Sequence, residues 1–204
     1  MRLGIFGGSF DPVHRGHMLL ADCCAEQAEL DEVWFVPAAH QPLKPAGPVA
    51  SNADRLAMLQ LVGAEQPKLV ASTIEFDRGG VSYTVDTLET IHTQRPDDQL
   101  FFLMGADSLA DFPNWHRPAD ICRLATPLVV QRAGLPPPDF QTLEPFVDSQ
   151  RLEAIRQSLV EMPPTPISSS QIRSLIATRG EWQALVPDAA AGYIESNQLY
   201  VDQR

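Results

Sequence analysis

The chain has 204 residues, of which 44% are hydrophobic and 20% are charged, so it is long enough to bury a core and is not typical of a disordered protein. Its 15 Lys and Arg residues against 26 Asp and Glu residues give a net charge of -11, which argues against a nucleic-acid partner, because binding a phosphate backbone needs clustered cations. No apolar run approaches the ~20 residues of a membrane helix, and the first residues lead directly into a strand-like run. We therefore expect no membrane segment and a cytoplasmic location.

Short apolar runs alternate along the chain with segments of helical periodicity. We predict strands over residues 2–7, 32–37, 69–74, 99–105, 127–131 and 159–162. We predict helices over residues 16–28, from residue 51 onward, and over residues 84–92, 169–178 and 188–196. In the first helix the predicted apolar positions are Met18, Leu19, Cys23 and Ala25. Residues 133–149, with three consecutive prolines, are predicted as a loop.

This alternation is typical of a parallel sheet covered by helices on both faces. We therefore predict one α/β domain over residues 1–204, with a Rossmann-like, doubly wound sheet and a small helical C-terminal part at about 167–204. Ligands of such a sheet bind at the carboxyl ends of its strands. The three cysteines have no spacing typical of a zinc site, and we expect no metal held by the protein itself.

The turn after the first strand, residues 7–17, reads GGSFDPVHRGH. Its spacing fits neither the dinucleotide fingerprint nor the P-loop. Its two glycines let the backbone approach a ligand, and the helix that follows presents free N–H groups and a positive dipole end. His14 and His17 are three residues apart, so they face the same way at the helix start, and Gly16 leaves room between them. A glycine pair alone is usually structural, but with these histidines the turn predicts a phosphate site.

The same turn resembles the signature of the H-x-G-H nucleotidyltransferase superfamily, and the chain is similar, more narrowly, to the nicotinate-nucleotide adenylyltransferases. The resemblance runs nearly end to end, through residues 82–88, 105–109 with Trp115, 167–173 and 193–200. It implies an enzyme that transfers AMP from ATP to nicotinate mononucleotide, giving nicotinate adenine dinucleotide and pyrophosphate in NAD biosynthesis.

The resemblance also implies roles for single residues. The ATP-binding residues it implies are Gly7, Gly8, Ser9, Phe10, His14, His17, Gly105, Asp107, Ser168, Ser169 and Arg173. Of these, His14, His17 and Arg173 are implied to be catalytic: they stabilise charge as pyrophosphate leaves, while the 5′-phosphate of the acceptor attacks the α-phosphorus. Asp107 is implied to meet ribose hydroxyls. Mg²⁺ is implied by the ATP chemistry and would be held mainly by phosphates and water.

A second set of residues is implied to bind nicotinate mononucleotide. It comprises Gly8, Ser9, Lys44, Tyr83, Thr84, Trp115, His116 and Arg132. Trp115 would stack on the pyridine ring, and the backbone N–H groups of Thr84 and His116 would receive the carboxylate. Backbone donors of this kind distinguish an acid from an amide, because an unpaired buried carboxylate is costly.

The residues themselves leave structural alternatives open. Ser168 to Ser170 also form an ordinary N-cap cluster, and Asp107 is also typical of a helix N-cap. Trp115 is equally a core or lid aromatic, and Lys44 a solvated loop lysine. Gln41 and Leu43 depart from the family pattern, which usually has a proline and a histidine at those places. Arg55 is expected to brace the fold, and neither His40 nor His92 is assigned a role.

Two other functions compete with this prediction. One is another nucleotidyltransferase of the superfamily, with phosphopantetheine or nicotinamide mononucleotide as acceptor. The other is a non-catalytic nucleotide sensor, which we would expect to have lost His14, His17 or Arg173. The sequence favours neither a monomer nor a homo-oligomer, and it leaves open whether residues 133–149 close over substrate.

Overall fold

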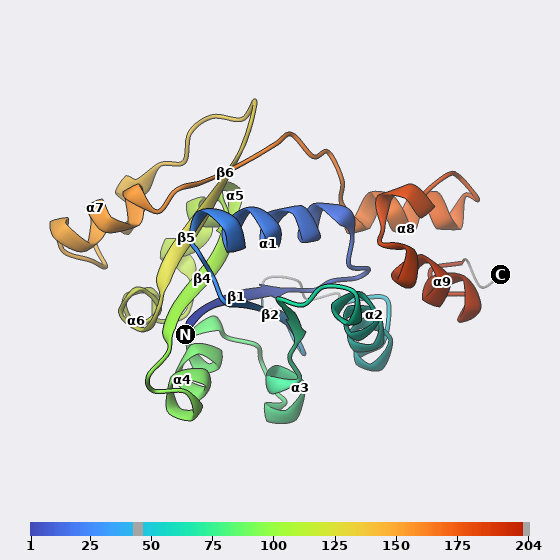
Figure 1. The fold of residues 1–204 in the computed structure, drawn as a ribbon, viewed down its shortest axis with the longest axis horizontal. Helices are drawn as coiled ribbons and strands as arrows, with labels where there is room; N and C mark the ends of the chain where they lie inside the picture. Colours follow the sequence, from blue (N-terminus) through green and yellow to red (C-terminus); the bar gives the residue numbers. More distant parts are fainter. Residues whose placement is uncertain (43–46, 202–204) are drawn as a thin grey trace.

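The computed structural model describes residues 1–42 and 47–201. In these residues six strands form one all-parallel sheet in the order β3-β2-β1-β4-β5-β6 (Figure 1). The strands are β1 (Arg2–Gly8), β2 (Glu32–Pro37), β3 (Leu69–Ala71), β4 (Gln99–Gly105), β5 (Thr126–Arg132) and β6 (Val160–Met162). The predicted Rossmann-like architecture is therefore confirmed.

Helices connect these strands. The α-helices are α1 (Arg15–Gln27), α2 (Asn52–Ala64), α3 (Ile74–Arg78), α4 (Thr84–Gln94), α5 (Ala106–Asp111), α6 (Pro118–Leu124), α7 (Ser149–Gln157), α8 (Ser169–Ala177) and α9 (Asp188–Ser196). Short 3₁₀ turns cover Phe112–Asn114, Phe140–Leu143 and Gln183–Leu185. Figure 1 shows α8 and α9 together at one end of the molecule, beside α2, and α7 at the opposite end.

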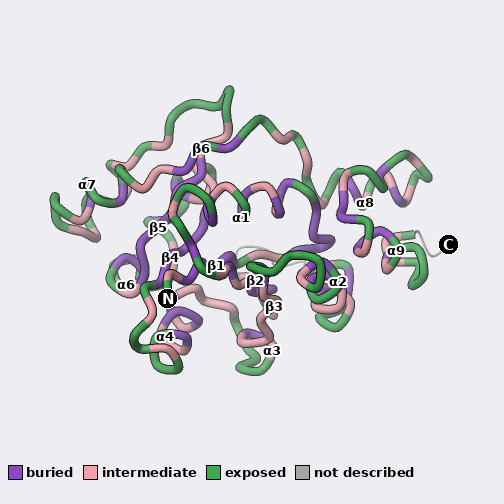
Figure 2. Tube along the Cα trace, viewed as in Figure 1, coloured by how far each residue is buried: buried purple, intermediate pink, exposed green. Residues whose placement is uncertain are grey.

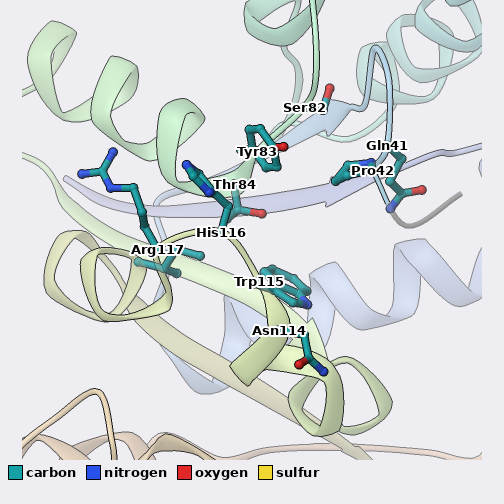
Figure 3. Close-up of a pocket in the computed structure, with 10 residues that line it drawn as sticks. Gln41, Pro42, Ser82, Tyr83, Thr84, Asn114, Trp115, His116 and Arg117 are labelled. Atoms are coloured by element: carbon teal, nitrogen blue, oxygen red, sulfur yellow. The ribbon is translucent and has the colours of Figure 1, made fainter. Parts of the chain in front are cut away.

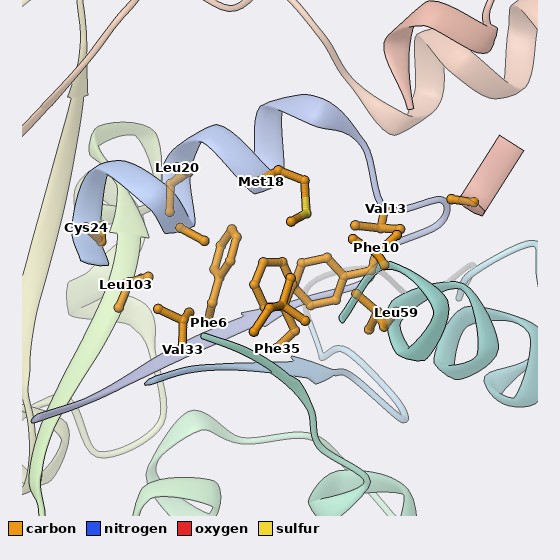
Figure 4. Packing of buried hydrophobic residues seen from close by; sticks show 14 of the residues in the cluster. Phe6, Phe10, Val13, Met18, Leu20, Cys24, Val33, Phe35, Leu59 and Leu103 are labelled. Atoms are coloured by element: carbon orange, nitrogen blue, oxygen red, sulfur yellow. The ribbon is translucent and has the colours of Figure 1, made fainter. Parts of the chain in front are cut away.

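Successive strand residues point to opposite faces of the sheet, and each face has its own core. Phe6 and Phe35 pack with α1, α2, α8 and α9 on one face (Figure 4). Leu3, Ile5 and Phe102 pack with α4, α5, α6 and α7 on the other. The central strands are therefore buried on both sides, and most of their trace is purple in Figure 2, which explains why they read as continuous apolar runs.

The strand order places the switch point of the sheet at β1, whose neighbours are β2 on one side and β4 on the other. The chain leaves the carboxyl ends of β1 and β4 at Gly8 and Gly105. In an open α/β sheet the loops at such a point diverge and leave a crevice for a ligand. The predicted phosphate turn therefore begins at the edge of this crevice.

Two local predictions differ from the structure, and helices α3, α5, α6 and α7 were not predicted. The strand predicted over residues 69–74 ends at Ala71, because helix α3 starts at Ile74 with Glu75 and Asp77 in its first turn, where the helix dipole favours acidic groups. In α1, Met18 and Ala25 are buried as predicted, but the other buried apolar positions include Leu20 and Cys24, while Leu19 and Cys23 are only partly buried against the same core. Helix α7 was missed because its only buried residues are Leu152 and Ile155, too few to make a visible period.

Residues 133–137 of the predicted loop are exposed and lie outside any strand or helix, but the rest of it includes the 3₁₀ turn Phe140–Leu143, with Leu143 buried, and α7 begins at Ser149. Across residues 1–42 and 47–201, no helix has both the length and the apolar character needed to cross a membrane.

Candidate active site

A cavity of about 490 Å³ lies at the carboxyl ends of β1 and β4, and we call it the phosphate cavity. The phosphate loop, which we define as residues 7–12, forms one wall through residues 7–11, and the N-termini of α1 and α8 converge on the cavity. Every described residue implied to bind ATP lines this cavity: Gly7, Gly8, Ser9, Phe10, His14, His17, Gly105, Asp107, Ser168, Ser169 and Arg173. Two helix N-termini on one cavity make a strong site for an anion, since both present N–H groups and positive dipole ends.

His14 and His17 fix each other at the start of α1. The backbone N–H of His17 donates to Nδ1 of His14 at 3.3 Å, and the backbone N–H of His14 donates to Nδ1 of His17 at 3.2 Å. The two rings are stacked, with centroids 3.6 Å apart. Because each Nδ1 accepts a hydrogen bond, the proton of each neutral ring is on Nε2.

Burial keeps His14 neutral. Burial of the side chain, with a smaller contribution from the positive charge of Arg132, lowers its pKa to about 4, against a smaller opposite effect of a backbone hydrogen bond. Near pH 7 His14 is therefore a hydrogen-bond donor through Nε2 rather than a cation. Arg132 and Arg173 bring permanent positive charge to the cavity.

Glycines make this arrangement possible. A Cβ on Gly16 would lie 3.0 Å from the His14 ring, so the space that Gly16 leaves is filled by His14 itself. A Cβ on Gly8 would lie 3.0 Å from the ring of Phe10. Phe10 adopts a left-handed conformation, with φ of 47°, and its ring is buried in the core near Phe35 (Figure 4). The same ring meets His17 edge-on.

Helix α8 is fastened to the phosphate loop by side chains that line the same cavity. Ser168 caps the helix by accepting from the N–H of Gln171 at 3.2 Å. The hydroxyl of Ser169 donates to the carbonyl of Pro12 at 2.9 Å, and Nη1 of Arg173 donates to the carbonyl of Asp11 at 2.6 Å. The N-cap role expected for this serine cluster and its place in the cavity are therefore both present.

Asp107 lies in the first turn of α5, whose N-cap is Gly105, so the N-cap alternative for Asp107 was wrong. A Cβ on Gly105 would collide with the Asp107 carboxylate, and glycine is therefore what lets that carboxylate fold back over the end of β4. Arg55 braces the loop as expected. It is fully buried and donates to the carbonyls of Ser9 at 2.7 Å and Ala38 at 2.8 Å.

A second cavity of about 440 Å³, which we call the aromatic cavity, lies beside the N-terminus of α4 (Figure 3). It is lined by Gln41, Pro42, Ser82, Tyr83, Thr84, Asn114, Trp115, His116, Arg117 and Ile121. The rings of Tyr83 and His116 lie 4.4 Å apart, and Trp115 faces the same space. Four of the residues implied to bind the second substrate, Tyr83, Thr84, Trp115 and His116, are thus brought together here.

Among the described residues, the aromatic cavity offers backbone donors rather than an arginine that is not already paired. Thr84 is the first residue of α4, so its N–H has no partner within the helix. Arg117 lines the cavity, but its guanidinium donates to Glu89 at 2.7 Å and to Asp120 at 2.8 Å. A carboxylate in this cavity would therefore meet the end of α4 more readily than a free arginine.

Gln41 lines both cavities. Its Oε1 accepts from the hydroxyl of Ser9 at 2.9 Å, which holds the side chain between them. In the sequence Gln41 stands out only as a departure from the family pattern, so its place at the junction was not predicted. Gly8, Ser9 and Arg132, implied for the second substrate, lie in the phosphate cavity, while Lys44 falls outside the described residues.

Comparison with known proteins agrees with this geometry. The model of the cytidylyltransferase-like family matches residues 5–175. A probable nicotinate-nucleotide adenylyltransferase of Rhodopirellula baltica is 43% identical over 97% of this chain and 92% of its own length. Another, from Geobacillus thermodenitrificans, is 37% identical over 98% of this chain and 86% of its own.

Among solved structures, the nicotinic acid mononucleotide adenylyltransferase of Plasmodium falciparum complexed with NaAD is similar with a TM-score of 0.72. The match covers 98% of this chain and 97% of that one at 18% sequence identity, so it supports the fold.

Proposed function

The chain belongs to the cytidylyltransferase-like family and, within it, to the nicotinate-nucleotide adenylyltransferases, and from this membership we infer that it transfers AMP from ATP to nicotinate mononucleotide. The products are nicotinate adenine dinucleotide and pyrophosphate, so the protein is a nucleotidyltransferase of NAD biosynthesis. We propose that the phosphate cavity holds ATP and that the aromatic cavity holds the nicotinate ring.

The observation that carries this proposal is that the two cavities adjoin at Gln41. The phosphate cavity combines two helix N-termini with His14, His17, Arg132 and Arg173, which suits a polyphosphate. The aromatic cavity combines Trp115 and the end of α4, which suits a flat ring that carries a carboxylate. A 5′-phosphate between them would lie next to the α-phosphate of ATP.

The reaction needs no nucleophile from the protein. An oxygen of the acceptor's 5′-phosphate forms a bond to the α-phosphorus of ATP, the bond from that phosphorus to the α,β-bridging oxygen breaks, and pyrophosphate leaves with the negative charge. His14, His17 and Arg173 then act by stabilising this charge, and the rigid loop acts by holding the reactants in line. The fixed histidine pair is suited to this role because its donors need no rearrangement.

Recognition of the acid is assigned to the backbone. The N–H of Thr84, at the positive end of α4, and the N–H of His116 would donate to the nicotinate carboxylate. A nicotinamide group carries no negative charge and puts an NH₂ donor against these N–H groups, so it would bind more weakly.

We propose that Mg²⁺ enters with ATP. Within residues 1–42 and 47–201, no three His, Cys, Asp or Glu side chains are grouped so as to share a metal ion. The donor set therefore fits an ion held by phosphate oxygens and water, which would neutralise charge on the polyphosphate. A cytoplasmic location, a single-domain organisation and the absence of a nucleic-acid partner stay predictions.

The test is pyrophosphate release from ATP and Mg²⁺ with three acceptors in parallel: nicotinate mononucleotide, nicotinamide mononucleotide and phosphopantetheine. We expect strong turnover with the nicotinate form. Equal use of the amide would keep the reaction and discard the backbone carboxylate site. Turnover with phosphopantetheine alone would favour another transferase of the superfamily, and no turnover with any acceptor would favour a nucleotide sensor.

A further inference from the structure

Tyr200 reaches back from the C-terminal part of the chain to the phosphate loop. Its hydroxyl donates to Oδ1 of Asp11 at 2.9 Å, across 189 positions of sequence. Asp11 lines the phosphate cavity and is only 3% exposed. Nothing in the proposed reaction uses either side chain, although both stand in segments that resemble the family.

Asp11 has donors on both carboxylate oxygens. Oδ1 accepts from the backbone N–H of Ala50 at 3.0 Å as well as from Tyr200, and Oδ2 accepts from the backbone N–H of Val49 at 2.7 Å. Nη1 of Arg173 donates to the Asp11 carbonyl at 2.6 Å and lies 3.6 Å from Oδ2. Both oxygens of Asp11 therefore have closer donors, and its ion pair with Arg173 is a long one, at 3.6 Å.

Tyr200 is held in an unusual conformation at this contact. Its φ is 62°, in the left-handed region that a bulky side chain rarely adopts, so its contacts must offset the cost. Burial raises the pKa of its hydroxyl, and the negative charge of Asp11 and the hydrogen bond to it raise that pKa further. The hydroxyl therefore stays protonated near neutral pH and donates to Asp11.

We propose that Tyr200 is a positioning residue for ATP binding, which holds Asp11 so that Arg173 faces the polyphosphate. Without the Tyr200 hydroxyl, the buried Oδ1 of Asp11 keeps only the N–H of Ala50 as a donor, so the carboxylate is less well satisfied. The nearest cationic donor is then Nη1 of Arg173. The guanidinium then shortens its 3.6 Å contact with the Asp11 carboxylate and moves away from the cavity. This inference rests on the proposed function, because it takes Arg173 as a ligand of ATP.

The chain contains a matched control. Tyr193 is also partly buried, and its hydroxyl donates to an aspartate too, Oδ1 of Asp54 at 3.0 Å. Neither Tyr193 nor Asp54 lines the phosphate cavity or the aromatic cavity. Y193F therefore removes a comparable hydrogen bond from the same C-terminal part without touching Asp11.

The experiment compares wild type, Y200F and Y193F by calorimetric titration with MgATP in the absence of any acceptor, and by thermal unfolding. We expect Y200F to weaken ATP binding about five- to tenfold, as for partial loss of a hydrogen bond to a charged group. We expect Y193F to change it less than twofold. Equal changes in ATP affinity for both variants, or none for Y200F, would overturn the proposal even where both lower the Tm.

A double-mutant cycle with D11N tests the route through Asp11. If Tyr200 acts through this carboxylate, Y200F has a smaller effect on ATP affinity in the D11N background than in wild type. If Y200F weakens ATP binding by the same factor in the D11N background as in wild type, the proposal is overturned. Failure of the wild-type chain to bind MgATP would instead refute the proposed function, so the two failures are distinguishable.

Discussion

The backbone N–H of His14 donates to the ring of His17, and the backbone N–H of His17 donates to the ring of His14, at 3.2 Å and 3.3 Å. This reciprocal pair is a capping box built from two histidines rather than from a serine and a glutamate. It satisfies two N–H groups at the start of α1 and at the same time fixes both ring tautomers. The same two hydrogen bonds that cap the helix therefore also leave the proton of each ring on Nε2, where it can be donated to a ligand in the phosphate cavity.

Loss of one ring should cost activity far more than stability. We expect His17→Ala to lower kcat by about 10²–10³, the effect of removing one preorganised donor to a leaving group. Pyrophosphate release measures the rate, and circular dichroism and thermal unfolding show that the variant folds. His92→Ala, on α4 away from both cavities, is the control and should turn over normally. Near-normal turnover of a folded His17→Ala protein would contradict the mechanism.

The low pKa of His14 makes stability depend on pH. Between pH 6.5 and pH 4 the unfolded chain binds a proton at this residue and the folded chain does not, so the free energy of unfolding falls as the pH is lowered. The loss is at most about 3 kcal/mol, at roughly 1.4 kcal/mol for each unit of pKa difference. Urea unfolding at several pH values measures it.

His14→Asn isolates this effect, because asparagine is also a strong N-cap and does not titrate. The stability of the variant should fall less than that of wild type between pH 6.5 and pH 4. Parallel curves for the two proteins would show that His14 is not the group responsible.

The acid specificity can be tested at a single N–H group. Thr84 is the first residue of α4, where proline is tolerated because that N–H has no helical partner. Tyr83, before it, is already extended, with ψ of 131°, as the residue before a proline prefers. Thr84→Pro should therefore keep the helix and raise KM for nicotinate mononucleotide roughly 10- to 100-fold, the loss of one hydrogen bond to a charged group.

Thr84→Ala separates the side chain from the backbone, since it removes the hydroxyl and keeps the N–H. We expect its KM to stay within about threefold of wild type, a difference of under 1 kcal/mol. If Thr84→Ala and Thr84→Pro raise KM equally, the hydroxyl rather than the N–H binds the substrate.

The sheet could be predicted because each of its main strands is buried on both faces. Residues 99–105 and 32–37 read as apolar runs, and the predicted bounds agree with β4 and β2. Short helices with few buried residues, such as α6 and α7, leave no such period. The left-handed conformation of Phe10 could not be expected, because it is stabilised by tertiary packing against Phe35 and His17.

Site prediction had a similar limit. In a motif that is local in sequence, such as the His14 and His17 pair, the spacing of the residues already indicates that their side chains lie side by side. Contacts between distant residues do not, and the hydrogen bonds from Ser9 to Gln41 and from Tyr200 to Asp11 appear only once the chain is folded. The departure at Gln41 was visible in the sequence, but its meaning depends on the two cavities that it joins.

Gln41 offers the sharpest test of the junction, because its Oε1 already accepts from Ser9 and its NH₂ group is what distinguishes it from glutamate. Gln41→Glu keeps the acceptor and replaces those donors with negative charge between two phosphate-bearing ligands. We expect kcat/KM to fall at least tenfold for both substrates, since like charges within about 4 Å cost over 1 kcal/mol near a protein surface. Gln41→Met, similar in length and uncharged, should lower kcat/KM only about threefold. Added salt should partly restore the kcat/KM of the Gln41→Glu variant but not that of Gln41→Met, because salt screens the added charge. If the two substitutions lower kcat/KM equally and salt changes neither effect, no substrate phosphate lies close to Gln41.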